Sequence, residues 1–273
     1  MKTLRRLAPT VPLCIAVLLA APVAHARTLC TVIADADTGE FVVKQGRCDE
    51  RVTPASTFKI ALALMGFDSG FLKNEHAPVL PFREGYPAWN ESWKQPTDPQ
   101  RWLKYSVFWF SQRVTYALGK ERFARYAEEF AYGNADVSGD PGKGNGLERS
   151  WVSSSLKISP LEQIGFLRKL IHDQLPVSRG ASEMTRRTIE AIELPDGWTA
   201  HGKTGTAYPK MPDGSSDEAH GYGWYVGWIT KGKKSFVFAR LDQDEKKASP
   251  PTGLRVRDSL LPTLPALLGP TAK

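Results

Sequence analysis

The order of strand-type and helix-type patterns is the strongest constraint that this sequence places on its fold. Val, Ile and Phe residues gather in 31–47 around a turn signal at 37–40, and strand patterns return at 199–206, 221–230 and 235–242. Helical patterns lie between them, at 58–65, 107–118, 121–130, 161–175 and 181–192, and another follows Gly253. This order predicts two lobes, with a sheet built from both ends of the chain around an inserted helical lobe.

A chain of 273 residues can bury a sizeable core as one large domain or two interleaved lobes. Its 41% hydrophobic and 24% charged residues exclude the disordered, collagen-like and polytopic membrane classes. We expect an α/β lobe from roughly residues 27–53 and 182–273, and a helical lobe from roughly residues 54–181.

The first 26 residues are typical of a secretory signal peptide. Basic residues near the start precede an apolar run over 11–23, and Ala24-His25-Ala26 matches a signal cleavage site. A run of about 13 residues is too short to cross a bilayer, which needs roughly 20. We therefore expect cleavage after Ala26, a periplasmic location and no membrane attachment of the mature chain.

The net charge changes when this segment is removed. The formal charge of +7 includes three basic residues of the signal, so the remaining 247 residues carry +4. The Lys-Gly-Lys-Lys cluster at 231–234 is typical of a hairpin tip, and no basic stripe interleaved with aromatic residues is present in the sequence. We expect a solvated basic surface and no nucleic-acid partner.

Removal of the signal also takes away Cys14 and leaves a pair of cysteines. A hairpin centred on Gly39 would place Cys30 opposite Cys48, and a disulfide between them suits an exported protein. Two free buried thiols are the alternative.

A Ser-x-x-Lys motif stands at the start of the first helical pattern, with Ser56 and Lys59 one turn apart on the same face. Serine needs a base to become a nucleophile, and lysine becomes a base when apolar surroundings remove its charge. About one such motif is expected by chance, and a second copy does occur at Ser154 and Lys157. A capping box at Ser159 begins a new helix just after that copy, so we favour Ser56.

Downstream, Lys203-Thr204-Gly205-Thr206 lies in a strand pattern. A strand edge with a cation, a hydroxyl and a glycine can receive a substrate carboxylate while its backbone comes close. An ordinary edge strand is the alternative, but the presence of both motifs argues against coincidence.

Together the two motifs resemble those of the serine β-lactamases and penicillin-binding proteins, and within that group class D, the oxacillinase type. The further matches are Tyr132-Gly133-Asn134, Trp151, the run from Tyr222 to Trp228, and Ser106-Val107-Phe108 in place of the family's Ser-x-Val. The resemblance implies an α/β fold of the α+β type, with an antiparallel sheet flanked by helices and an inserted all-helical lobe. It also implies hydrolysis of β-lactam antibiotics through a serine acyl-enzyme.

The resemblance implies a role for each matched residue. Ser56 is the nucleophile, and Lys59 is carboxylated by CO₂ to a carbamate that serves as the general base. Trp151 donates its indole N–H to that carbamate. The family uses no metal, and CO₂ or bicarbonate is the only small molecule that this chemistry adds.

Other matched residues would bind the substrate or move a proton. Ser106 relays a proton to the leaving nitrogen with the help of Lys203, and the backbone N–H groups of Ser56 and Thr206 form the oxyanion hole. The expected substrate-binding residues are Thr204, Gly205, Thr206 and Arg255, with Arg257 as the alternative to Arg255 if the last helix is shifted.

The expected pocket-lining residues are Phe108, Tyr132, Asn134 and Val152. Tyr132 and Asn134 are expected to shape their loop more than to take part in the chemistry. Phe108 is much larger than the family's valine, and we expect it to affect deacylation or the choice of substrate.

Two rival functions share these motifs: a D-alanyl-D-alanine peptidase and a β-lactam sensor domain. A zinc-dependent enzyme is disfavoured because the histidines at 76, 172, 201 and 220 lack ligand spacing. We expect small-molecule β-lactams as partners, and a monomer or weak homodimer.

Overall fold

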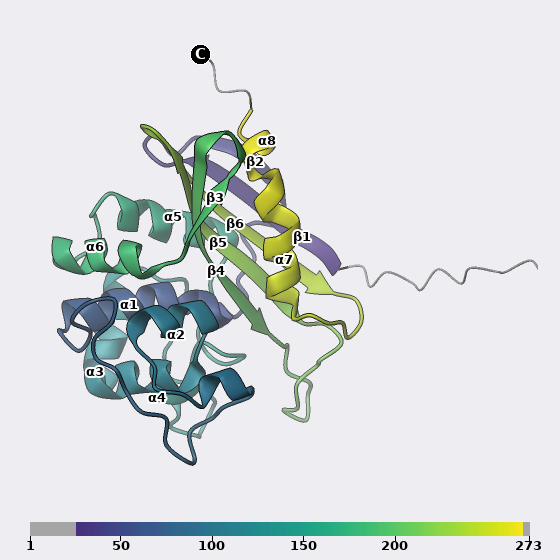
Figure 1. Ribbon diagram of the computed structural model, residues 1–273. Helices are drawn as coiled ribbons and strands as arrows, with labels where there is room; N and C mark the ends of the chain where they lie inside the picture. The colour runs from purple at the N-terminus through teal and green to yellow at the C-terminus, as the bar shows by residue number, and fades with distance from the viewer. Residues whose placement is uncertain (1–25, 270–273) are drawn as a thin grey trace, which may run out of the picture.

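A computed structural model describes residues 26–269, so the expected signal peptide lies outside the described residues except for Ala26. One antiparallel sheet has the strand order β2-β1-β6-β5-β4-β3 (Figure 1). Its strands are β1 (Ala26–Asp35), β2 (Phe41–Gly46), β3 (Ala191–Leu194), β4 (Trp198–Ala207), β5 (Tyr222–Lys231) and β6 (Lys234–Asp244). β1 pairs with β6, which confirms that both ends of the chain build the sheet.

The helices lie on both sides of this sheet (Figure 1). They are α1 (Lys59–Asp68), α2 (Pro99–Tyr105), α3 (Phe108–Glu129), α4 (Gly146–Arg149), α5 (Pro160–Ile171), α6 (Arg179–Thr188), α7 (Thr252–Leu260) and α8 (Leu264–Leu267). The larger core joins α1, α3 and α5 to one face of the sheet, and α7 covers the other face through Val256 and Leu260. No helix between residues 26 and 269 has the length and apolarity that a membrane crossing needs.

Side chains cap the starts of α2 and α5, and the cap of α5 is the capping box predicted at Ser159. Asp98 caps α2 by accepting the N–H of Arg101 at 2.7 Å, and Ser159 and Glu162 form the capping box of α5. The two helical patterns at 107–130 form one element, α3, which is interrupted at Gly119 with φ at +74°.

The prediction of a helix over 181–192 is wrong at the C-terminal end of that range. α6 ends at Thr188, and the residues after it form β3, in which Ala191 pairs with His201 of β4. Hydrogen bonding to β4, the next strand along the chain, satisfies the backbone of this short segment, and the pattern of apolar residues does not show that pairing.

The predicted disulfide between Cys30 and Cys48 is present, with the two Cα atoms 5.1 Å apart. The register behind that prediction is wrong, because Cys30 pairs with Gly46 and not with Cys48. The turn is centred between residues 37 and 38 and not at Gly39, since Ala34 pairs with Phe41. A β-bulge between Ile33 and Ala34 recovers only part of the difference. Cys48 reaches its partner from just beyond the end of β2.

Gly133 lies where the loop after α3 touches the backbone before α5. Its φ is +60°, and a Cβ there would overlap the carbonyl oxygen of Lys157. We predict that Gly133→Ala lowers the free energy of unfolding by at least about 2 kcal/mol. Gly142 has φ at +70° with no described atom near an added Cβ, so Gly142→Ala should cost about 1 kcal/mol. Urea unfolding measures both, and equal losses would contradict the role of the overlap.

Candidate active site

Ser56 and Lys59 meet where a short 3-10 turn, Ala55–Phe58, leads into α1. The Nζ of Lys59 donates to the Oγ of Ser56 at 3.1 Å. Ala55 opens the turn with φ at +52°, and its N–H donates to the carbonyl oxygen of Trp151 at 3.0 Å. The long loop that carries Trp151 therefore helps to hold the serine turn in place.

Lys59 is fully buried, with an exposed fraction of 0%. Burial lowers the pKa of its amine well below the ordinary lysine range, and the positive charge of Lys203 lowers it further. A neutral amine beside a serine hydroxyl has the lone pair that a proton acceptor needs. The second Ser-x-x-Lys copy differs, because Lys157 is exposed to solvent.

Trp151 is also fully buried and lies among aromatic rings. Its ring centroid is 5.8 Å from that of Phe58, 5.9 Å from that of Phe108 and 6.4 Å from that of Phe123. The indole Nε1 has no hydrogen-bond partner within the part of the chain that the structure describes. A buried indole N–H normally donates to an acceptor, so this position suits a hydrogen-bond acceptor that the unmodified side chains do not supply.

Ser106 ends α2 in the left-handed conformation, with φ at +59°. Its N–H caps the helix by donating to the carbonyl of Trp102, and its Oγ is buried without a hydrogen-bond partner among residues 26–269. This hydroxyl is therefore able to accept or donate a proton without first breaking a protein contact.

The strand motif passes directly against the serine turn. A Cβ added at Gly205 would lie 3.0 Å from the carbonyl oxygen of Pro54 and 3.1 Å from Cγ2 of Thr57, so glycine permits this approach. Lys203 is 6% exposed and donates to the carbonyl oxygen of Thr204 at 3.2 Å. Burial, with Arg257 nearby, lowers the pKa of Lys203 to about 8, while the carboxylate of Glu190 acts in the opposite direction.

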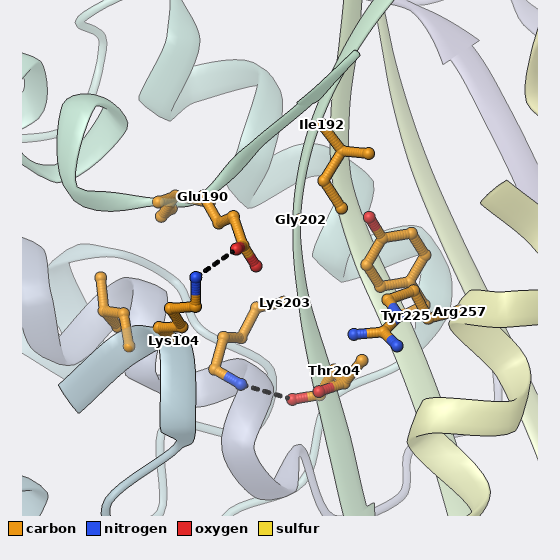
Figure 2. Close-up of a pocket in the computed structure, with 10 residues that line it drawn as sticks. Lys104, Glu190, Ile192, Gly202, Lys203, Thr204, Tyr225 and Arg257 are labelled. Carbon is orange, nitrogen blue, oxygen red and sulfur yellow. Dashed lines mark hydrogen bonds and ion pairs between the residues drawn. The ribbon is translucent and has the colours of Figure 1, made fainter. Parts of the chain in front are cut away.

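A pocket opens at the edge of β4 beyond the point where β3 stops pairing with it (Figure 2). The polar side chains that line it are Lys104, Glu190, Lys203, Thr204, Tyr225 and Arg257. The sequence did not indicate Lys104 or Glu190, because no motif or spacing connects them to the serine, and it gave Tyr225 no role of its own within the matched run from Tyr222 to Trp228.

The two candidate arginines of α7 have different environments. Arg255 donates to a carboxylate oxygen of Asp244 at 2.5 Å and to the carbonyl of Pro250 at 2.8 Å. Arg257 lines the pocket in Figure 2, while Nε of its guanidinium contacts Asp258 at 2.8 Å. The structure thus places Arg257, and not Arg255, beside Lys203 and Thr204.

None of the four residues that the sequence predicts as pocket-lining lines the pocket of Figure 2. They lie instead near the buried Lys59 or in the long loop that contains Trp151. Tyr132 is buried against Phe58, with ring centroids 5.0 Å apart. The side chain of Asn134 joins two parts of its loop by accepting the N–H of Lys157 and donating to the carbonyl of Ser155, each at 2.9 Å.

The other two are apolar. Phe108 is buried beside Trp151 and stacks on Trp89 with ring centroids 4.9 Å apart, and Val152 is half-buried against the core. Within residues 26–269, no group of three or more His, Cys, Asp and Glu side chains is arranged to hold a metal ion.

We predict that Lys59→Met stabilises the fold in CO₂-free buffer, by about 1–2 kcal/mol at pH 7. Because burial lowers the pKa of Lys59, the unfolded chain binds a proton there that the folded chain lacks, up to the ordinary lysine value of 10.5. The wild-type free energy of unfolding therefore rises with pH over this range, and the advantage of the variant shrinks toward pH 10.

Urea unfolding at several pH values tests this expectation. Lys157→Met, at the exposed lysine of the second motif copy, should stay within about 0.5 kcal/mol of the wild type throughout. A Lys59→Met variant with the same pH dependence as the wild type would contradict a neutral Lys59.

Comparison with known proteins supplies the family. The penicillin binding protein transpeptidase domain matches residues 29–262. Beta-lactamase OXA-9 of Klebsiella pneumoniae is 44% identical over 241 residues, which cover 88% of this chain and 88% of the relative. Beta-lactamase OXA-1 of Escherichia coli is 35% identical over 222 residues, which cover 80% of this chain and 77% of the relative.

A solved structure agrees with these relatives. The crystal structure of the class D β-lactamase OXA-427 is 47% identical to this chain and superposes with a TM-score of 0.82, covering 88% of this chain and 98% of that chain. Both the sequence relatives and this structure span most of the chain, sheet and helices included. The chain therefore belongs to the class D β-lactamases, a family of hydrolases that share the transpeptidase fold.

Proposed function

We propose that this chain hydrolyses the amide of β-lactam antibiotics through an ester on Ser56, and so gives antibiotic resistance. The observation that carries the proposal is the buried Nζ of Lys59, 3.1 Å from the Oγ of Ser56, at a position where burial lowers the pKa of the amine and favours its neutral form. The partnerless indole N–H of Trp151 in the described chain supports it, since that donor fits an anionic oxygen.

A carboxylate group added to the Lys59 amine by CO₂ supplies the general base, and the neutral amine is the form that reacts with CO₂. Ser56 Oγ attacks the lactam carbonyl and loses its proton, and the ring C–N bond breaks. Ser106 relays a proton to the leaving nitrogen. Water then hydrolyses the Ser56 ester, and its proton leaves through the same base.

The substrate is held by the edge of β4. The backbone N–H groups of Ser56 and Thr206 stabilise the oxyanion, which is worth on the order of 3 kcal/mol per donor. Thr204 and Arg257 bind the ring carboxylate, with the charge of Lys203 alongside. We assign this role to Arg257 because it lines the pocket, whereas Arg255 does not and is paired with buried Asp244.

The proposal extends to the setting of the enzyme. Residues 1–26 direct export to the periplasm, where the chain acts on small-molecule β-lactams without a metal, as a monomer or weak dimer. The helical lobe, roughly residues 54–181, and the α/β lobe form the two walls of the site. Phe108 beside Trp151 narrows access to the base and affects the rate of deacylation.

Turnover tests this function. Residues 27–273, mixed with excess chromogenic cephalosporin, should give sustained hydrolysis that increases with added bicarbonate. One stoichiometric burst without a steady state would favour a peptidase or a β-lactam sensor instead.

The role of the base is tested by Lys59→Ala and Trp151→Ala. Both should accumulate the Ser56 ester, with deacylation slowed by at least about 100-fold, because the base or its supporting donor is missing. Intact-protein mass spectrometry measures the ester, and Lys157→Ala serves as the control with wild-type deacylation. Full, bicarbonate-independent activity of Trp151→Ala would refute the role of the carboxylated lysine.

The KM values and unfolding free energies of two alanine variants should distinguish the roles of the two arginines. Arg257→Ala is expected to raise KM about 10- to 100-fold, since a charge-assisted contact to the substrate carboxylate is lost. Arg255→Ala should change KM less than about threefold, yet lower the free energy of unfolding by about 1–3 kcal/mol because buried Asp244 loses its partner. Steady-state kinetics and urea unfolding decide, and the reverse pattern would restore Arg255 as the anchor.

A further inference from the structure

The pocket at the β4 edge contains a carboxylate that the proposed chemistry does not use. Glu190 lies between α6 and β3, and its side chain lines the same pocket as Thr204 and Arg257 (Figure 2). An acidic side chain beside an anion-binding site opposes the binding of the anion, so its presence there calls for a physical account.

The Glu190 carboxylate has one cationic partner, Lys104 of α2, whose Nζ lies 3.1 Å away. Both side chains are about half exposed, so this contact alone contributes little to stability. The contact between Lys104 and Glu190 joins helix α2 to the segment that leads into β3. In Figure 2 this contact lies over Lys203 in the pocket. Lys203 itself donates to the carbonyl of Thr204 and not to Glu190.

The chemistry of the substrate brings one of its substituents to this pair. In a cephalosporin, the carbon that carries the carboxylate is bonded to C3, which carries a variable substituent. If Thr204 and Arg257 hold the carboxylate, a charged group on C3 lies in the same small pocket as Glu190. Two charged groups in one small, partly desolvated pocket attract or repel each other strongly enough to change the free energy of substrate binding.

We propose that Glu190, balanced by Lys104, determines specificity for the charge of the substituent next to the substrate carboxylate. The site favours cephalosporins with a cationic C3 substituent and disfavours those with an anionic one. Lys104 limits this preference, because it neutralises part of the carboxylate charge. This inference rests on the proposed function and adds a substrate class to it.

Three cephalosporins with the same acylamino side chain test the proposal. They carry a pyridiniummethyl, an acetoxymethyl or a carboxymethylthiomethyl group on C3, and kcat/KM is measured for each from the loss of lactam absorbance. Because kcat/KM covers the steps up to acylation, later departure of the C3 group does not enter the comparison. The quantity compared is the ratio of kcat/KM for the cationic substrate to that for the anionic one.

Glu190→Gln should lower this ratio about tenfold, with the acetoxymethyl substrate falling between the other two. Lys104→Met should raise the ratio about threefold, because the carboxylate of Glu190 is then uncompensated. Opposite shifts from the two partners of one contact distinguish an electrostatic role from damage to the fold. Thermal unfolding of each variant is measured in parallel.

Glu193→Gln is the matched control. Glu193 is an exposed carboxylate three residues further along, on β3, and its side chain accepts a hydrogen bond from Thr199 and does not line the pocket. This variant removes the same charge and should leave the ratio unchanged. An equal effect of Glu193→Gln and Glu190→Gln would overturn the proposal, since it would reflect net charge alone.

The remaining outcomes separate this inference from the proposed function. A wild type that opens all three cephalosporins, with a ratio that Glu190→Gln leaves unchanged, refutes the specificity role and leaves the hydrolase intact. A wild type that opens none of them, with or without bicarbonate, refutes both.

Discussion

The burial of the Lys59 amine is the constraint on which the rest of the structure depends. An ammonium ion in an apolar interior is costly, so the fold holds this lysine in its neutral form, with its pKa far below the ordinary range. α1 achieves this because it is apolar on all sides and buried from Lys59 to Phe67. A helix of that kind must be enclosed by other elements, and α6 and α3 pack directly against it.

The second constraint is the close approach of the sheet to the serine turn. Gly205 lets β4 lie against Pro54 and Thr57, so that the strand edge and the nucleophile form one surface. Because the pairing of β3 with β4 ends at Ala191 and His201, the edge of β4 beyond that point is open and lines the pocket. Burial and the nearby charge of Arg257 lower the pKa of Lys203 at this opening, and the carboxylate of Glu190, which pairs with Lys104, acts in the opposite direction.

Much of the fold could be predicted because its signals are local. Asp98 and Ser159 start their helices with side chains that reach only three residues ahead. The order of strand and helix patterns required a sheet from both ends of the chain, and the structure has it. The hairpin register and the end of α6 could not be predicted, because the position of the first turn and the pairing of β3 with β4 decide them, and the local pattern of apolar residues shows neither.

The sequence by itself determined the motifs at Ser56 and Lys203 and the disulfide partners, because each depends on neighbours in the chain or on a shared family pattern. The tertiary structure alone decided which arginine faces the pocket, since the rotation of α7 turns Arg257 toward Lys203 and Arg255 toward Asp244. It also brought Glu190 to the site. No spacing connects that residue to Ser56, and only the fold places its carboxylate beside Lys104 of α2 in the pocket.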